Sequence, residues 1–460
     1  MMGRQADQPA FLYDFALDRH VPTDHMLRSI DRFVELDEMR ARLAPFYSTT
    51  GRPSIDPELL IRMLLVGYCY GIRSERRLCE EVHLNLAYRW FCRLGLDGAV
   101  PDHSTFSKNR HGRFRESELL RQLFEMVVRR AIKEGLVGGE GFAVDASLIA
   151  ADANKQRSVP GTEETDWQSL AVTRRSVHEY LDTLDQAAWG TASEVTPKFV
   201  SKSDPAAQWT GAHKGHAFFA YSDNYLIDLK ASIILDVEPT RAIRQAEVGA
   251  TKTMIERTEE RFGLKPQRLC GDSAYGTAEI LNWIVTEKQI APHVALWDKT
   301  ERTDGTFSQS EFTFDADANS YTCPAGKRLL QYRRRFANLR TGITKQQRRI
   351  YRASKKDCAV CPLKEKCCPG VPARKVSRSV HEAARDVVRS LRHTPEYLQS
   401  RRERKKIEML FAHLKRILHL GRLRLRGPCG ARDEFLLAAT AQNLRKLAKL
   451  IPLPQPAMAI

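Results

Sequence analysis

The sequence predicts a mixed α/β protein in which helices precede a mixed sheet and a cysteine-containing insertion interrupts it. Apolar residues at helical spacing dominate residues 1–135. Between residues 136 and 300, short runs rich in β-branched and aromatic residues alternate with helical segments. Five of the ten cysteines gather between residues 301 and 394. Strands that alternate with helices are typical of a sheet with helices packed on its faces.

The composition favours a nucleic acid as the partner. The chain has 460 residues, of which 42% are hydrophobic, and a formal net charge of +17. Such a positive field attracts polyanions. No apolar run approaches the ~18–20 residues of a membrane span, and the N-terminus does not resemble a signal peptide. We therefore expect a nucleoid-associated protein of the cytoplasm, with a basic but functionally neutral surface as the alternative.

Residues 1–135 are expected to form an all-α N-terminal domain. Residues 57–70 are apolar nearly all round, which is typical of a buried helix. Ser74 is a good N-cap for the next helix, and residues 86–94 and 116–132 have further helical patterns. Short helices with basic and aromatic residues between them are typical of a helix-turn-helix-like DNA-binding region. A plain helical bundle that supports the rest of the chain remains the alternative.

Residues 136–300 are expected to supply the first part of the sheet. Strand character covers residues 136–150, and the apolar run 141–144 ends at Asp145. The turn-prone pair Asp223 and Asn224 separates two apolar runs and suggests a hairpin there. The remaining expected elements are a helix at 169–187, a helix at 244–262, a strand at 268–271, a helix at 277–288 and a strand at 291–297.

The last third of the chain is expected to contain an insertion and then helices that complete the core. Residues 301–394 are polar and rich in Arg and Lys, and they contain the cysteine cluster. Helices resume near Pro395 and continue to about residue 450. Residues 451–460 are Pro-rich and are expected to be a flexible tail.

Three widely separated acids are candidates for one metal site: Asp145, Asp272 and Glu408. Asp145 and Asp272 each follow a strand, and Glu408 lies on a basic C-terminal helix. Hard divalent cations take oxygen ligands, and two such ions ~3.5–4 Å apart can clamp a phosphoryl group. Each acid alone is equally typical of a turn, a helix cap or a surface ion pair. Other strand-adjacent acids compete for the same role, namely Asp152, Asp204 and Asp236.

The helix around Glu408 has a charged stripe beside an apolar face. At ~100° per residue, Arg404, Glu408 and Lys415 fall within roughly 40° of one another. The apolar face, which we expect to bury against the sheet, consists of Ile407, Leu410, Leu414 and Ile417.

These residues resemble the DDE-type transposases of bacterial insertion sequences, which have a ribonuclease-H-like core. FAVDASLIAADAN and RLCGDSAYGT are similar to the strands that carry the first and second Asp of that family. The spacing of Arg404, Glu408 and Lys415 matches the signature around the family's final Glu, although Arg401 stands where that signature has Tyr. Tyr397 shares the face of Arg404 only if the helix begins that early. The resemblance extends from about residue 10 to 450 and includes GRPSIDPELLIRMLLVGYCYG, SKSDPAAQW, YTCPAGKRL and CAVCPLKEKCC.

The resemblance implies a ribonuclease-H-like mixed sheet and a transposase that cuts and joins DNA. Asp145, Asp272 and Glu408 would hold two Mg²⁺ or Mn²⁺ ions. Arg404, Lys415 and Arg401 would bind phosphates of double-stranded DNA, both at the terminal inverted repeats and at the target. The family also implies a homodimer on paired ends. Two alternatives remain: a transposase-derived DNA-binding protein without activity, and a ribonuclease-H-like nuclease without strand transfer.

The late cysteines form a candidate structural zinc site. Two residues separate Cys358 from Cys361, and five residues separate Cys361 from Cys367. Cys323 precedes them by a 34-residue gap. Four thiols in this order suit a tetrahedral Zn²⁺ site, with Cys368 redundant. Buried reduced thiols are the alternative.

Overall fold

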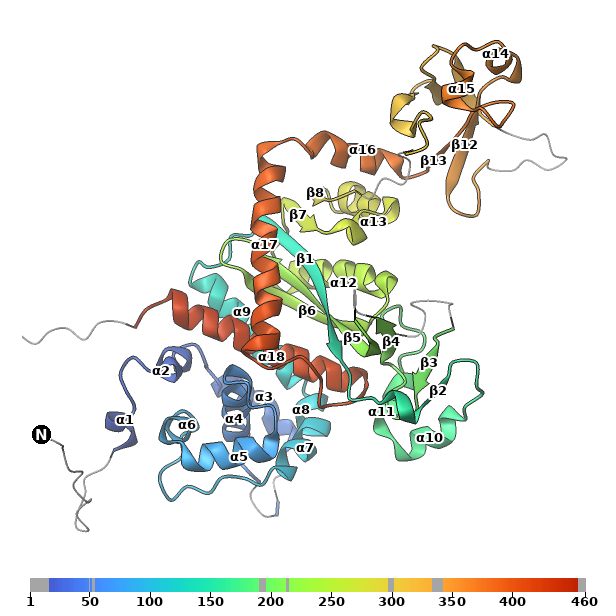
Figure 1. Cartoon of the computed structure of the whole chain (residues 1–460). Helices are drawn as coiled ribbons and strands as arrows, with labels where there is room; N and C mark the ends of the chain where they lie inside the picture. The colour runs from blue at the N-terminus through green and yellow to red at the C-terminus, as the bar shows by residue number, and fades with distance from the viewer. Residues whose placement is uncertain are drawn as a thin grey trace, which may run out of the picture. The chain divides into compact units, whose positions relative to one another are not determined.

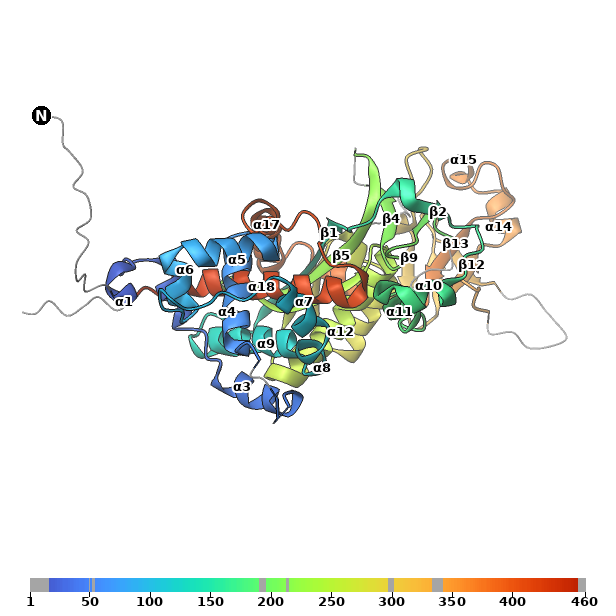
Figure 2. The same cartoon turned by 90° about the horizontal axis from the view of Figure 1, so that it is seen from below.

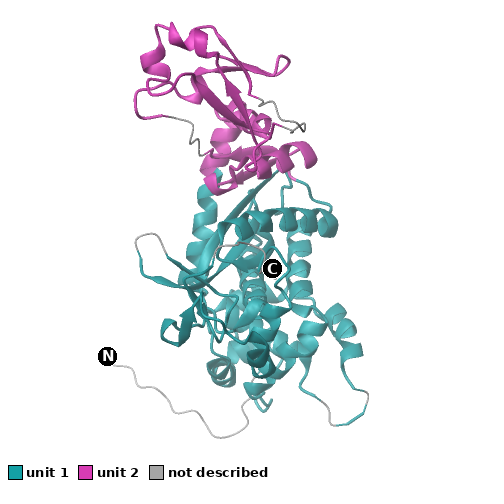
Figure 3. Cartoon of the chain, turned by 90° about the vertical axis from the view of Figure 1, so that its right-hand side faces the viewer, with its two compact units in different colours: residues 1–265, 403–460 teal, residues 266–402 magenta. Residues whose placement is uncertain are grey.

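The computed structural model describes residues 16–48, 50–51, 54–189, 196–211, 215–296, 302–332 and 342–453. The chain divides into two compact units (Figure 3). Unit 1 contains residues 1–265 and 403–460, and unit 2 contains residues 266–402. Among the described helices, none is long and apolar enough to cross a membrane.

Helices make up the first part of unit 1, as the sequence predicts. They are α1 Leu17–His20, α2 Met26–Asp31, α3 Asp37–Leu43, α4 Pro57–Cys69, α5 Glu75–Leu84, α6 Leu86–Phe91, α7 Ser104–His111, α8 Arg113–Glu116 and α9 Leu119–Lys133. Asp56 caps α4 by accepting a hydrogen bond from the Glu58 amide at 2.9 Å. The Ser74 hydroxyl accepts from the Arg77 amide at 3.4 Å and caps α5, so the predicted N-cap is confirmed.

A sheet of antiparallel strands forms the centre of unit 1 (Figure 1). Its strands are β1 Gly141–Ala150, β4 Gln208–Gly211, β5 Ala217–Asp228 and β6 Ile233–Arg241. β5 pairs with β1 along one edge. Along its other edge β5 pairs with β6 and, farther back in its sequence, with β4. A separate antiparallel pair consists of β2 Ser158–Pro160 and β3 Phe199–Ser201.

The expected turn at Asp223 and Asn224 is wrong, because both residues lie inside β5. Asn224 donates to the carbonyl oxygen of Glu238 at 2.7 Å and to the hydroxyl of Thr240 at 3.0 Å. These bonds to β6 satisfy the side-chain nitrogen of the residue that sequence reasoning assigned to a turn. The real turn follows Asp228, whose carboxylate accepts from the Lys230 amide at 2.9 Å.

Helices cover both faces of this sheet. On one face, the Tyr225 hydroxyl donates to Gln442 of α18 (Gly427–Leu450) at 3.0 Å. The neighbouring residue Ser222 points to the opposite face, where its hydroxyl donates to Glu247 of α12 (Arg244–Phe262) at 2.5 Å. α18 is buried along most of its length and also packs on α4 and α9 (Figure 2). The predicted helix at 244–262 is confirmed with the same bounds.

Two other expected elements of unit 1 differ in detail. The helix expected at 169–187 is two helices, α10 Trp167–Thr173 and α11 Arg175–Leu181, because Arg174 between them is extended (φ −128°, ψ 104°). Along α17 (Pro395–Arg416), Ile407 and Leu414 are fully buried as expected. Ile417 lies just past the end of α17 and is 47% exposed, so its place on the apolar face was wrong.

Unit 2 begins with two parallel strands and helices. β7 Arg268–Gly271 pairs with β8 Ala291–Val294, which confirms both predicted strands. Between them α13 Ala278–Asn282 continues as a π-helical turn at Trp283–Glu287. α16 Glu382–Leu391 and the first part of α17 follow later in the chain. Trp297, expected at the end of β8, lies outside the described residues.

The predicted insertion contains a second sheet that the sequence did not reveal. Its five antiparallel strands are, in spatial order, β13 Lys375–Ser379, β12 Arg348–Arg352, β11 Arg328–Gln331, β10 Ser320–Thr322 and β9 Thr313–Asp315. Short helices α14 Lys355–Ala359 and α15 Lys364–Cys367 carry cysteines. The assignment of residues 1–135, 136–300, 301–394 and 395–450 to separate functional domains stays a prediction. Residues 454–460 of the expected flexible tail lie outside the described residues.

Candidate active site

Asp145 lies in the middle of β1 rather than at its end. The strand continues to Ala150 because residues 146–150 keep their pairing with β5. The Asp145 side chain is half-buried, and its carboxylate accepts from the Ala146 amide at 2.9 Å. Its partner across the strands is Tyr225.

A second carboxylate, Asp223, shares the sheet face of Asp145. Asp145 is opposite Tyr225 and Ser147 is opposite Asp223 in the antiparallel register. Side chains that are directly opposite project from the same face, and alternate residues of one strand do so too. The face therefore carries Asp145 and Asp223 two rungs apart.

The C-terminal half of α17 lies along this same face. The ring of Phe411 stacks on that of Tyr225, with centroids 5.0 Å apart and an interplanar angle of 16°. Lys406 donates to the carbonyl oxygen of Leu229 at 3.4 Å. Glu408 lies between these two contacts and is exposed, next to the buried Ile407. Unit 1 thus brings Asp145 and Glu408 to the same side of one sheet.

Asp223 is the acid that sequence reasoning missed as a site residue. It is 0% exposed, and neither carboxylate oxygen accepts a well-formed hydrogen bond within the described residues. Burial raises the pKa of Asp223 well above its usual value, while the nearby Tyr225 hydroxyl and Lys415 oppose the shift. The local sequence contains no clear signal for it, because Ser222, Asp223 and Asn224 interrupt the apolar residues of the segment 217–228.

The basic residues of α17 differ in their surroundings. Burial lowers the pKa of Lys415, and the carboxylate of Asp223 opposes this shift. The Arg404 side chain is half-buried, and its Nε has no hydrogen-bond partner among the described residues. Arg401 is exposed and belongs to the part of α17 in unit 2.

Asp272 lies directly after β7, at the strand end where the sequence placed it. It belongs to unit 2 and is half-buried. Its carboxylate accepts from the Ala274 amide at 2.6 Å and caps the 3-10 turn Ser273–Tyr275. The capping role and a metal-binding role are compatible, because the cap uses one of the two carboxylate oxygens.

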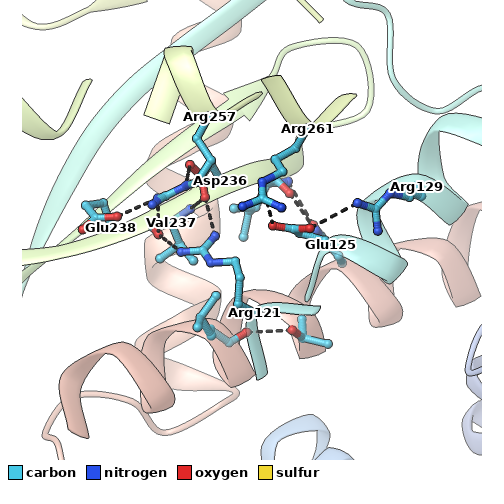
Figure 4. A network of polar contacts seen from close by, with 12 residues as sticks. Arg121, Glu125, Arg129, Asp236, Val237, Glu238, Arg257 and Arg261 are labelled. Carbon is cyan, nitrogen blue, oxygen red and sulfur yellow. Dashed lines mark hydrogen bonds and ion pairs between the residues drawn. The ribbon is translucent and has the colours of Figure 1, made fainter. Parts of the chain in front are cut away.

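The three competing acids of unit 1 have structural partners. Asp152 pairs with Arg422 at 3.0 Å and Arg426 at 2.9 Å. Asp236 accepts from Arg121 at 2.6 Å and Arg257 at 2.7 Å, as Figure 4 shows.

Asp204, the third competitor, is buried and accepts a hydrogen bond from the Tyr221 hydroxyl. Burial raises the pKa of Asp204 to about 7. Each of the three rivals of Asp145 therefore has a structural partner in unit 1.

Tyr397 lies on α17, because this helix begins at Pro395. The Tyr397 hydroxyl donates to the carbonyl oxygen of Val294 at 3.0 Å, and its ring lies 5.4 Å from that of His293. His293 in turn contacts the Ser400 hydroxyl at 2.7 Å. Tyr397 therefore joins the start of α17 to β8 within unit 2.

The acids suit a hard cation by their donor chemistry. The unsatisfied oxygens of Asp223 and the carboxylate of Asp145 offer oxygen ligands on one face. Within the described residues, however, no three His, Cys, Asp or Glu side chains form a group that could hold a metal ion.

The late cysteines surround one small cavity in unit 2. Its lining includes the four expected ligands Cys323, Cys358, Cys361 and Cys367, and also Cys368. The Lys327 amide donates to the sulfur of Cys323 at 3.3 Å. Burial raises the pKa of Cys367 to about 11 and also raises that of Cys368.

An N-terminal and a C-terminal region of the chain each match a known family model. The family model "Transposase domain (DUF772)" matches residues 15–112. The model "Transposase DDE domain" matches residues 322–448, which include Glu408. Among solved structures, the chain is similar to a piggyBac transposase in a synaptic complex with hairpin DNA, at 8% identity and a TM-score of 0.32 over 93% of this chain and 73% of that chain. That likeness is distant and assigns no residue. The two family matches agree with the sequence motifs, and together they support an insertion-sequence DDE transposase.

Proposed function

We propose that the chain binds the terminal inverted repeats of an insertion sequence and catalyses metal-dependent DNA cleavage and strand transfer. The observation that carries this proposal is the packing of α17, the helix of Glu408 and Lys415, on the sheet face that carries Asp145 and Asp223, together with the match to a transposase DDE domain. Asp272 is the third acid of the proposed triad.

Asp145, Asp272 and Glu408 would hold two Mg²⁺ or Mn²⁺ ions. Bound ions would supply Lewis-acid stabilisation of the charge that develops on the scissile phosphate. Water in the first step, and a DNA 3′-hydroxyl in the second, would attack phosphorus and displace a 3′-oxygen of the DNA, without a covalent enzyme–DNA bond. For this reason no nucleophilic Ser or Tyr is needed.

The cations of α17 would position DNA at this site. Lys415 lies close enough to Asp223 for each charge to affect the other's pKa. Its ammonium can bind a phosphate as a point charge, while the guanidinium of Arg404 can bind one bidentately. Arg401 is exposed one helical turn before Arg404 and would contact the DNA backbone farther from the acids.

The proposed core is ribonuclease-H-like. The antiparallel order β6–β5–β1 in unit 1 supports it, as does the parallel pair β7–β8 with an intervening helix in unit 2. The helices of residues 1–135 would contribute DNA binding, and two copies would act on paired ends. DNA binding by these helices and the action of two copies are both expected from the family.

We also propose a structural Zn²⁺ held by Cys323, Cys358, Cys361 and Cys367. The common cavity and the amide-to-sulfur bond at Cys323 support it. As they stand, the described thiols form no metal-holding group, so a bound ion would have to draw them together. It would also have to displace protons, because burial holds the pKa of Cys367 near 11.

A DNA reaction distinguishes the proposed function from its two alternatives. Purified protein is incubated with labelled duplex that contains the element's terminal repeats, in Mg²⁺ and separately in EDTA. Magnesium-dependent nicking followed by joining to a target duplex supports a transposase. Binding without nicking would identify a silent DNA-binding protein, and nicking without joining would identify a nuclease.

A further inference from the structure

Two neighbouring cavities of unit 1 are lined mainly by cations. The first has a volume of about 790 Å³, and six of its twelve lining residues are Arg or Lys. The second has a volume of about 850 Å³, with five Arg or Lys among twelve. Asp152 and Arg422 line both cavities, and Asp152 is the acid in each lining. We call the two cavities together the arginine groove.

The segment that connects α17 to α18 forms one wall of the arginine groove and is held firmly. The Leu423 amide donates to the Ala150 carbonyl at 2.7 Å, next to the end of β1. The Arg424 and Leu425 amides each donate to the buried carboxylate of Glu434 at 2.6 Å. The backbone is thus fixed, while the side chains of Arg422 and Arg426 remain 61% and 50% exposed.

The opposite wall is built from the region between β1 and β5. Arg174 donates to the carbonyl oxygen of Lys202 at 2.6 Å, and the Ser176 hydroxyl donates to that of Ser203 at 2.6 Å. These bonds hold Arg174 and Lys202 side by side. Arg157 is exposed and has no ion-pair partner in the part of the chain that the structure describes.

The arginine groove has more cationic side chains than acidic partners. Asp152 neutralises one of the two arginines that it binds, and Lys202 has an acidic partner in Glu163 at 3.3 Å. One of Arg422 and Arg426 therefore remains uncompensated at the groove, as do Arg157 and Arg174 within the described residues. Groups of fixed, solvent-accessible cations attract a polyanion.

We propose that the arginine groove binds the phosphodiester backbone of DNA and positions the strand without reading its sequence. This inference rests on the proposed function and adds the surface that guides DNA toward the acids. Lys415 lines the groove and also lies near Asp223, so the groove reaches the acid-bearing face. Phosphate contacts carry no sequence information by themselves. Tyr70 lines the second cavity, and stacking of a base on its ring would tolerate any sequence.

The test is the salt dependence of DNA affinity in the full chain. Arg157→Gln and Arg174→Gln are combined in one variant, away from the proposed catalytic residues. Each lost phosphate contact makes the slope of log K against log salt shallower by about one. We therefore expect a slope shallower by about two and, if the affinities are equal at 1 M salt, an affinity weaker by roughly 50- to 100-fold near 100 mM salt. The loss should be equal for terminal-repeat duplex and scrambled duplex.

Two further variants serve as controls, one for the position of the lost charge and one for the charge itself. Arg261→Gln with Lys265→Gln removes the same charge near the end of α12, outside the groove, and should leave the slope of wild type. Arg157→Lys with Arg174→Lys keeps the positive charge and should restore the wild-type slope. An unchanged slope in the Gln variant, or a loss confined to terminal-repeat DNA, would overturn the proposal. Wild type that binds no DNA would instead refute the proposed function.

Discussion

The two larger sheets of the molecule are built on different scales. In unit 1, β5 and β6 span twelve and nine residues and are almost entirely buried. In unit 2, the strands of the five-stranded sheet have three to five residues each. Two of the eight buried residues in the core of that sheet are cysteines, Cys367 and Cys368. Unit 1 can be stable through apolar burial alone, whereas a core this small usually needs a cross-link or a metal.

Removal of a bound metal should therefore produce the largest difference in stability between the two sheets. A chelator at neutral pH should raise amide exchange in β10–β12 by about tenfold or more, because structural zinc contributes folding free energy. Exchange in β5 and β6 should not change. The readout is hydrogen exchange with mass spectrometry, in wild type and in Cys358→Ser with Cys361→Ser.

The control for that experiment is Cys79→Ser, which alters a partly buried thiol of α5 in unit 1. It should keep the chelator response of wild type. Equal exchange in β10–β12 with and without chelator would mean that the late cysteines act as ordinary core residues.

Leu414→Ala should weaken unit 1 next most strongly. Leu414 is fully buried where α17 meets the sheet, so its truncation should cost about 2–5 kcal/mol. Met409 on the same helix is 69% exposed, and Met409→Ala should cost less than ~0.5 kcal/mol. Urea unfolding of both variants measures the difference. Equal losses would show that α17 is not packed through this face.

Asp204→Asn should change how stability depends on pH. Burial raises the pKa of Asp204 to about 7, so the folded state keeps a proton that the unfolded chain releases near pH 4. Wild-type stability should therefore fall as pH rises from about 4 to 7, by an amount on the order of a few kcal/mol. The Asn variant should lose this part of the slope.

The matched control is Asp152→Asn, because Asp152 is partly exposed and ion-paired. It should not flatten the fall between pH 4 and 7. Urea unfolding at several pH values gives the slopes, and an unchanged slope in Asp204→Asn would mean that its carboxyl group does not carry the effect.

Sequence reasoning succeeded where local pattern and long-range packing agree. The bounds of α12 and the strands β1, β7 and β8 follow from periodicity and composition. It failed at Asp223 and Asn224, where local turn preference loses to hydrogen bonds that Asn224 makes with β6. It also missed the five-stranded sheet, whose strands are too short for a clear alternation.

The candidate site shows the same division. Asp145 and Asp272 follow apolar runs, and Glu408 shares a helical stripe with Arg404 and Lys415, so all three were found from the sequence. Asp223 was not, because its burial depends on the register between β1 and β5 and on α17 above it. Such a register joins residues about 80 positions apart, which no local pattern encodes.

The central claim is that the three acids act together at one metal-dependent site, and single-turnover cleavage of terminal-repeat DNA in Mg²⁺ tests it most directly. Asp145→Asn, Asp272→Asn and Glu408→Gln should each reduce the cleavage rate by at least roughly a thousandfold, comparable to the loss of essential catalytic groups, while DNA binding stays near wild type. Asp236→Asn, a matched change at an ion-paired acid of the same sheet, should retain cleavage when assayed under conditions where it is folded. Cleavage near the wild-type rate in any of the three acid variants would remove that residue from the site and contradict the account.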